Sequence, residues 1–196
     1  MTLDILTNIL IFALTGIATL SCFRTEEGWK LQSGMQALRY FTILSNLLCA
    51  AASLLFILTL TQQDPAYWAW VLKYTGTAAV TVTLLTVLFF LGPTIGYRLL
   101  LTGRDFYLHL CGPLLALISF CFLEREYELG FPLFLVGMLP VLLYGLVYFY
   151  EVIIRRRWED FYGYNKNGRW PISMAAMFIG SFLVCVLIRA VYNLCE

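Results

Sequence analysis

The sequence is short of charged residues. Only 13% of its 196 residues are Asp, Glu, Lys or Arg, whereas 61% are hydrophobic; soluble domains carry roughly 25% charged residues. The surplus of apolar surface therefore indicates a bilayer as the surroundings of the chain. The net charge is +1 and the basic residues are scattered, which excludes nucleic acid as a partner, because phosphate-backbone binding needs a dense basic face.

Motifs of the common enzyme classes are also missing. The chain contains no GxSxG, HExxH, P-loop or GxGxxG motif, and its six cysteines form no CxxC pair. A single histidine and scattered carboxylates argue against a zinc site, and no other metal or cofactor is implied. Most of the cysteines lie within apolar runs, which is typical of small buried hydrophobic residues.

Long apolar runs predict the architecture. A membrane-spanning helix needs about 20 apolar residues, and six segments qualify: residues 4–23, 36–61, 67–91, 105–123, 131–154 and 171–193. Because the connections are short, the sequence predicts an all-α fold with one domain over residues 1–196, a polytopic membrane protein whose six transmembrane helices form one bundle. The first run has no basic region before it, so we interpret it as a retained span rather than a signal peptide.

The basic residues predict the orientation. Ten of the thirteen Lys and Arg residues fall in or beside the first, third and fifth connections: Arg24, Lys30, Arg39, Arg98, Arg104, Arg155, Arg156, Arg157, Lys166 and Arg169. Cytoplasmic loops carry an excess of Lys and Arg, so these connections are expected to face the cytoplasm and both termini to face outward. Aromatic residues are expected as anchors at the two interfaces: Tyr67, Trp68 and Trp70 at one, and Trp158, Phe161, Tyr162, Tyr164 and Trp170 at the other.

The only histidine, His109, lies inside the fourth apolar run. An ionisable side chain at that depth costs several kcal/mol unless it is paired or near water, so it indicates a functional site. Asp105 precedes it by four residues and shares its helix face. Pro113 follows by four residues and frees the carbonyl of His109 from its helical partner. The alternative is that His109 is a satisfied polar bridge between helices.

A polar stripe occupies the second apolar run. Thr42, Ser45, Asn46 and Cys49 recur at i, i+3, i+4 and i+7, which predicts one helix face turned away from lipid. Counted from residue 36, Thr42 lies at a depth of about 9 Å, and His109 lies about 6 Å into its own run. We therefore expect the two at matching depth, although such hydroxyl and amide groups can also serve only to hold helices together.

The remaining candidate residues lie on the fifth apolar run or close in sequence to Thr42 and His109. Glu151 and Asp105 are candidates to orient the imidazole of His109, although Glu151 can instead pair with Arg155 at a helix end. Because backbone N–H groups inside helices are already used, side chains or water are expected to stabilise an oxyanion. The candidate oxyanion, orienting and substrate contacts are Ser45, Asn46, Tyr144 and Tyr148. The aromatic loop 158–164 is either a lid or an interface anchor.

A threonine hydroxyl and an imidazole at matching depth predict a nucleophile and its base. A site one to two helical turns below the interface suits the ester of a fatty acyl chain, with the head group near the cytoplasmic surface. The predicted function is therefore an intramembrane hydrolase or acyltransferase acting on fatty-acyl lipid esters. The alternatives are a six-span ligand-binding or transport subunit, in which Thr42 and His109 line a polar site, and a structural or regulatory membrane protein.

The string Arg39-Tyr40-Phe41-Thr42-Ile43-Leu44-Ser45-Asn46-Leu47-Leu48 resembles the second-helix signature of a superfamily of small six-span membrane proteins, and His109 with Pro113 resembles its later histidine motif. The superfamily includes the androgen-induced and androgen-dependent TFPI-regulating proteins, intramembrane threonine hydrolases that cleave fatty acid esters of hydroxy fatty acids. The resemblance implies that Thr42 is the nucleophile and His109 the catalytic histidine. The Ser45-Asn46 pair is more similar to the bacterial branch, which implies the inner (plasma) membrane of a bacterium.

Overall fold

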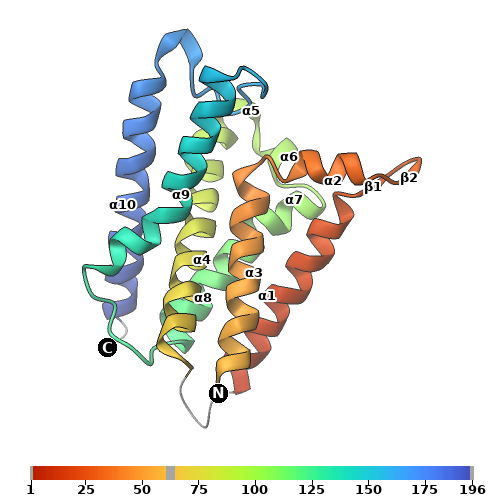
Figure 1. Ribbon diagram of the computed structural model, residues 1–196. Helices are drawn as coiled ribbons and strands as arrows, with labels where there is room; N and C mark the ends of the chain where they lie inside the picture. The colour runs from red at the N-terminus through yellow and green to blue at the C-terminus, as the bar shows by residue number, and fades with distance from the viewer. Residues whose placement is uncertain (1, 61–64, 195–196) are drawn as a thin grey trace.

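The computed structural model describes residues 2–60 and 65–194 as a bundle of long helices (Figure 1). Six segments are long and apolar enough to cross a membrane: Leu3–Ser21, Phe41–Thr59, Tyr67–Ile95, Arg104–Leu123, Leu133–Ile154 and Trp170–Leu194. They coincide with the six predicted segments apart from their ends. The prediction of an all-α, polytopic membrane fold is confirmed, and the chain is an integral membrane protein.

Three of the spans change helix type along their length. The first span is α1 (Thr2–Ser21), the second is α3 (Phe41–Thr59) and the sixth is α10 (Trp170–Leu194). The third joins α4 (Tyr67–Thr86), the π-helix η1 (Val87–Leu91) and α5 (Gly92–Ile95). The fourth joins α7 (Arg104–Phe106), the π-helix η2 (Tyr107–Cys111) and α8 (Gly112–Leu123), and the fifth joins α9 (Leu133–Phe149) to the π-helix η3 (Tyr150–Ile154).

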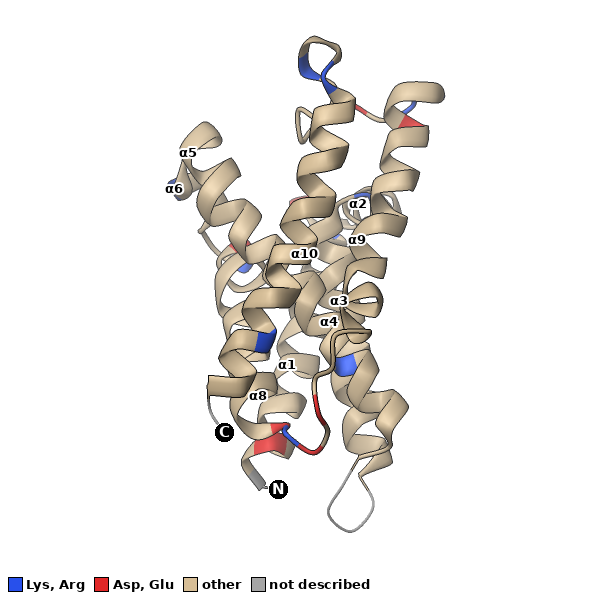
Figure 2. Ribbon diagram, turned by 90° about the vertical axis from the view of Figure 1, so that its left-hand side faces the viewer, with Lys and Arg blue, Asp and Glu red and all other residues tan. Residues whose placement is uncertain are grey.

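The first, third and fifth connections lie together at one end of the bundle, opposite the end that holds both termini (Figure 1). They contain an antiparallel pair, β1 (Arg24–Thr25) and β2 (Gly28–Trp29), the helices α2 (Leu31–Ala37) and α6 (Tyr97–Leu100), and a short 3-10 helix, η4 (Lys166–Gly168). We call this end the basic end, after the ten Lys and Arg residues named above, and the opposite one the terminal end. Charged residues gather towards the two ends of the bundle (Figure 2).

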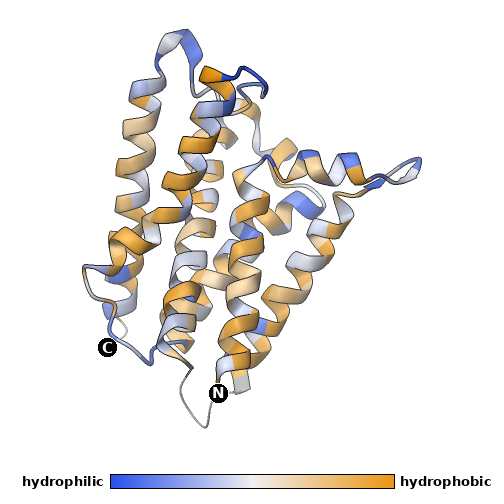
Figure 3. Cartoon of the chain, viewed as in Figure 1, coloured by the Kyte–Doolittle hydropathy of each residue, from blue (hydrophilic) through white to orange (hydrophobic). Residues whose placement is uncertain are grey.

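The bundle shows apolar side chains to its surroundings. Leu135 is 71% exposed, Ile179 60% and Phe89 76%, and hydrophobic residues run along the spans (Figure 3). Such an outward apolar surface fits lipid contact. Helix α4 is different, because it packs against α3, α8, α9 and α10. At its closest approach to α3, a Cβ atom on Gly76 would lie 2.7 Å from the Cα atom of Cys49, so glycine is what permits the contact.

The second span begins later than the sequence predicted. Residues 36 and 37 belong to the separate helix α2, which lies at a steep angle to α3 (Figure 1), and α3 begins at Phe41. Thr42 is therefore in the first turn of α3, and the expected depth of about 9 Å, which counted residue 36 as the start of the span, was wrong. Exposed Leu31 and Met35 lie on α2, as a helix in the interface plane requires.

Two of the π-helices end directly before a Gly-Pro pair. The amide of Gly92 donates to the carbonyl of Val87, and that of Gly112 to the carbonyl of Tyr107, five residues back in each case. The prolines that follow have no N–H to donate, so the backbone widens by one residue for one turn. His109 lies within η2, and the expected distortion beside it is therefore present.

Candidate active site

A cavity of about 570 Å³ lies towards the basic end, between α3, α4, η1, α9, α10 and the fifth connection. One part of its lining is polar and comes from the first turn of α3, the end of α9 and the fifth connection: Thr42, Tyr144, Tyr148, Tyr162 and Tyr164. Another part is apolar: Val82, Leu85, Phe89, Phe90, Val184 and Leu187. Ligand pockets of this size commonly combine apolar walls with a few polar groups.

Two tyrosines hold the start of α3, where Thr42 lies. The first N–H groups of a helix have no acceptor within the helix, and Tyr40 at the N-cap position makes no side-chain capping bond. Instead the amide of Phe41 donates to the hydroxyl of Tyr162 at 3.1 Å. The hydroxyl of Tyr144 donates to the carbonyl of Arg39 at 2.7 Å. The fifth connection and α9 thus position the first turn that carries Thr42.

The hydroxyl of Tyr162 also interacts with the side chains of Thr42 and Tyr144. Burial raises the pKa of Tyr162 to about 12, while hydrogen bonds with the backbone of Phe41 and with those two side chains lower the pKa in part. The phenol therefore keeps its proton at neutral pH. It is a hydrogen-bond donor beside Thr42 rather than a base.

Asp160 organises the loop that carries Tyr162. Its carboxylate accepts hydrogen bonds from the hydroxyl of Tyr148 at 3.0 Å and from the amides of Tyr164 and Asn165 at 2.7 and 2.8 Å. The amide of Tyr162 in turn donates to the hydroxyl of Tyr148 at 3.2 Å. The sequence left open whether the aromatic loop 158–164 is a lid or an interface anchor. In the structure these hydrogen bonds tie the loop to α9 beside the polar part of the cavity.

The polar stripe on α3 faces inward, as predicted. The side-chain amide of Asn46 in this stripe joins α3 to the π-helix η2, which carries His109. The amide nitrogen of Asn46 donates to the carbonyls of Thr42 at 2.8 Å and Leu108 at 3.0 Å. The hydroxyl of Ser45 donates to the carbonyl of Thr42 at 3.1 Å and lies 2.9 Å from that of Thr83 on α4. Both residues therefore hold α3 against its neighbours.

His109 is half-buried and is held by a backbone carbonyl. Its Nδ1 atom lies 2.6 Å from the carbonyl oxygen of Leu100, at the end of α6. A carbonyl oxygen only accepts hydrogen bonds, so Nδ1 carries the hydrogen and Nε2 of the neutral ring is left as an acceptor. His109 does not line the cavity. Among residues 2–60 and 65–194, no hydrogen bond joins it to Thr42.

Neither candidate carboxylate orients the imidazole within the described part of the chain. Asp105 lies 3.4 Å from Arg104, and Glu151 lies 3.5 Å from Arg155 one helical turn away. The helix-end pairing left open for Glu151 is therefore present. The carbonyl of Leu100 occupies the orienting position that the sequence assigned to a carboxylate.

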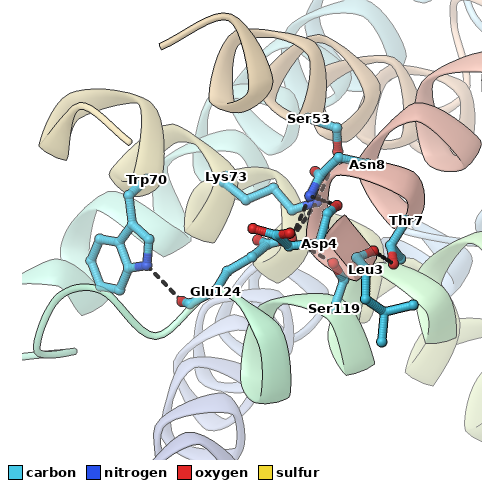
Figure 4. Close-up of polar contacts among 9 residues, drawn as sticks. All are labelled: Leu3, Asp4, Thr7, Asn8, Ser53, Trp70, Lys73, Ser119 and Glu124. Atoms are coloured by element: carbon cyan, nitrogen blue, oxygen red, sulfur yellow. Dashed lines mark hydrogen bonds and ion pairs between the residues drawn. The ribbon is translucent and has the colours of Figure 1, made fainter. Parts of the chain in front are cut away.

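Sequence reasoning missed a buried polar cluster near the terminal end (Figure 4). The ammonium of Lys73 on α4 donates to Asn8 Oδ1 at 2.6 Å and to Ser53 Oγ at 2.8 Å, and lies 3.4 Å from Glu124 Oε1. Asn8 Nδ2 donates to the same carboxylate oxygen at 2.7 Å, as does the hydroxyl of Ser119. The five side chains come from α1, α3, α4 and α8, and all are fully buried.

Charged residues within the apolar runs are the sequence feature from which this cluster could have been predicted. Lys73 lies two turns into the third span and Glu124 closes the fourth, and intramembrane ionisable residues pair with one another. We had placed Trp70 at the interface, which was wrong: it is fully buried, and its Nε1 donates to the carbonyl of Glu124 at 2.9 Å. Trp70 lies on the inner face of α4, whereas Tyr67 and Trp68 of the same helix are 51% and 55% exposed.

No family model, no curated protein and no solved structure matches this chain.

Proposed function

We propose that this chain is an intramembrane hydrolase or acyltransferase that acts on fatty-acyl lipid esters, with Thr42 as the nucleophile and His109 as the base. The observation that carries the proposal is the cavity of about 570 Å³, which has Thr42 in its polar lining. The resemblance of the residues around Thr42 and His109 to the intramembrane threonine hydrolases points to the same chemistry.

The lining of the cavity matches an amphipathic ligand. The apolar walls from α4, η1 and α10 accept an acyl chain, while the hydroxyls of Thr42, Tyr144 and Tyr162 accept its polar end. This places the ester bond beside the nucleophile and its head group towards the fifth connection. An alkane would match only the apolar part.

The reaction begins when Thr42 Oγ1 attacks the ester carbonyl carbon and His109 Nε2 takes the hydroxyl proton. The carbon–oxygen bond to the alcohol then breaks, and His109 returns the proton to the departing alcohol. The acyl group remains on Thr42 until water or an acceptor alcohol attacks it by the same steps in reverse. The Leu100 carbonyl supports this role, because it keeps hydrogen on Nδ1 and the lone pair on Nε2.

The two residues must approach each other for the proton transfer. Asn46 fastens α3 to η2 at the carbonyl of Leu108, the residue before His109. Catalytic hydrogen bonds are commonly long or misaligned in unliganded enzymes and tighten when substrate binds. We expect the same of the Thr42–His109 pair.

The basic end belongs in the cytoplasm under this proposal, with both termini outside, because Lys and Arg are retained on the cytoplasmic side. The resemblance to the bacterial branch supports a location in the inner (plasma) membrane of a bacterium as part of this proposal. A lipid ester would then enter from the cytoplasmic leaflet.

A second candidate is a ligand-binding or transport subunit. It is favoured by the position of His109 outside the cavity lining, since a binding protein needs the cavity but no nucleophile. Polar groups within spans also mark substrate paths.

Labelling with a long-chain alkyl fluorophosphonate separates the two candidates. The purified full-length protein is compared with Thr42→Ala, Thr42→Ser and His109→Ala, each checked for folding by thermal unfolding. Enzymatic function predicts labelling of the wild type, reduced labelling of Thr42→Ser and none of the alanine variants. A photoreactive fatty acid that crosslinks to the cavity of a folded but unlabelled wild type would instead favour the binding subunit.

A further inference from the structure

We propose that Tyr162, from the fifth connection, is a catalytic residue whose hydroxyl donates a hydrogen bond to the carbonyl oxygen of the bound ester. The inference rests on the proposed function and assigns the oxyanion donor for that reaction. The sequence had given this role to Ser45, Asn46 and Tyr144.

The side-chain donors of those three residues are already hydrogen-bonded to backbone carbonyls, which argues against this role for them. Asn46 uses its amide nitrogen on two backbone carbonyls, and Tyr144 donates its only hydroxyl proton to the carbonyl of Arg39. Ser45 donates to the carbonyl of Thr42. A donor that is already used in the protein must break that bond before it can stabilise a developing charge.

Tyr162 is different, because its hydroxyl is held by a bond that it accepts. The amide of Phe41 donates to the Tyr162 oxygen at 3.1 Å, so the phenol directs its own O–H towards the neighbouring side chains of the polar lining, where a bound ester can take their place. That hydroxyl interacts with the side chain of Thr42, and both residues line the cavity. An ester whose carbonyl carbon lies against Thr42 Oγ1 brings its carbonyl oxygen into the reach of the same phenol.

The surroundings of the phenol favour donation. Its pKa is raised by burial to about 12, so it stays protonated across the neutral range. It also lies at the amino-terminal end of the 19-residue helix α3, where the helix dipole stabilises negative charge. Thr42, as the second residue of α3, has no carbonyl four residues back within its own helix, so its amide can complete the pair of donors.

The loop supplies the rigidity that an oxyanion donor needs. Asp160 and Tyr148 fix the backbone on both sides of Tyr162 by hydrogen bonds of 2.7–3.2 Å. Preorganised donors of this kind stabilise the transition state because they do not have to reorganise during the reaction. The aromatic loop is then part of the active site and more than a cover.

The test compares Tyr162→Phe with Tyr150→Phe, in the full-length protein in detergent. Tyr150 is 47% exposed and lies outside the cavity lining, and among the described residues its side chain contacts the guanidinium of Arg155 through the ring. We expect Tyr162→Phe to slow fluorophosphonate labelling at least about 10-fold, since losing one oxyanion donor costs roughly 10²–10³ in rate. Tyr150→Phe is expected to label at the wild-type rate. With a 4-nitrophenyl fatty acyl ester, kcat should fall while KM stays within about 2-fold.

The outcomes separate the two proposals. If Thr42→Ala abolishes labelling and Tyr162→Phe labels as fast as the wild type, the role of Tyr162 is overturned and the hydrolase stands. If the folded wild type neither labels nor cleaves esters, both fail together.

Replacing Tyr162 with 3,5-difluorotyrosine provides a second test that keeps the shape of the side chain. The fluorines lower the pKa of the phenol, and only the protonated phenol donates. The labelling rate relative to wild type should therefore fall as pH rises through the lowered pKa. A ratio that does not change with pH would contradict a donor role, whereas a purely structural role predicts that constant ratio.

Discussion

Removal of the Lys73 ammonium is expected to destabilise the bundle strongly. Lys73 and Glu124 are both fully buried, and the ammonium is the only cationic group that contacts Glu124 Oε1 within the described residues. Lys73→Met leaves the carboxylate without its counter-charge, and breaking a buried ion pair from one side costs about 3–5 kcal/mol. For a protein of this size, 1 kcal/mol shifts Tm by about 2–4 °C, so a decrease of about 6–20 °C is expected.

The double variant Lys73→Met/Glu124→Gln tests the cause. Gln keeps the shape of Glu124 and the hydrogen bonds from Asn8 and Ser119 while removing the uncompensated charge. We expect the double variant to be more stable than Lys73→Met alone, because replacing both members of a buried pair is often close to neutral. Lys30→Met is the matched control, since Lys30 pairs with Glu27 at the surface, where ion pairs contribute little.

Thermal unfolding in detergent, followed by intrinsic tryptophan fluorescence, is measured for these four proteins and for the single variant Glu124→Gln, which completes the comparison. Trp70 is one of five tryptophans and donates to the carbonyl of Glu124, so its share of the emission is sensitive to the cluster. A Lys73→Met variant that melts within about 2 °C of Lys30→Met would refute the reasoning. So would additive effects in the double variant, because coupled residues are expected to deviate from additivity by about 0.5–3 kcal/mol.

Three further outcomes follow from the packing. Gly76→Ala should lower Tm, because its Cβ would lie 2.7 Å from the backbone of Cys49, while Gly16→Ala, which meets nothing within 4 Å, should not; thermal unfolding checks both. Gly180→Phe should keep the fold but weaken crosslinking of a photoreactive fatty acid, because Gly180 lines the cavity and a Cβ atom added to it would meet nothing within 4 Å. Asp160→Ala should increase proteolysis within the fifth connection and slow fluorophosphonate labelling, because two amides and one hydroxyl lose their acceptor; unchanged cleavage would contradict its role in ordering the loop.

The spans were predictable because each is a long apolar run, and hydropathy needs no knowledge of neighbours. The helix ends were less predictable: residues 31–40 continue the amphipathic pattern, yet the chain turns at Tyr40 and places Thr42 in the first helical turn. This displacement reverses one step of the sequence argument. Backbone amides were set aside as oxyanion donors on the assumption that Thr42 lies inside a helix, whereas the first turn leaves its amide without a helical partner.

Contacts between elements that are far apart in the sequence could not be predicted from it, for a physical reason. Periodicity places Asn8, Lys73 and Glu124 on their own helices, but only the packing of α1, α4 and α8 brings them within 2.6–3.4 Å of one another. Tyr162 is a similar case, since its loop is tied down by Asp160 and Tyr148, and no helical spacing relates it to Thr42.

The two ends of the bundle use polar groups in opposite ways, and this difference bears on where the proposed reaction would take place. Near the terminal end, the ammonium of Lys73 is surrounded by acceptors with no exposed surface, so the cluster fixes α1, α3, α4 and α8 in register. Near the basic end, α4 continues into the π-helix η1, α9 into η3, and a cavity opens between them and α10. A rigid half that holds α3 and α4 gives Thr42 a fixed position, while the widened half provides room for a lipid. The three proposed catalytic groups, Thr42, His109 and Tyr162, all lie in the second half.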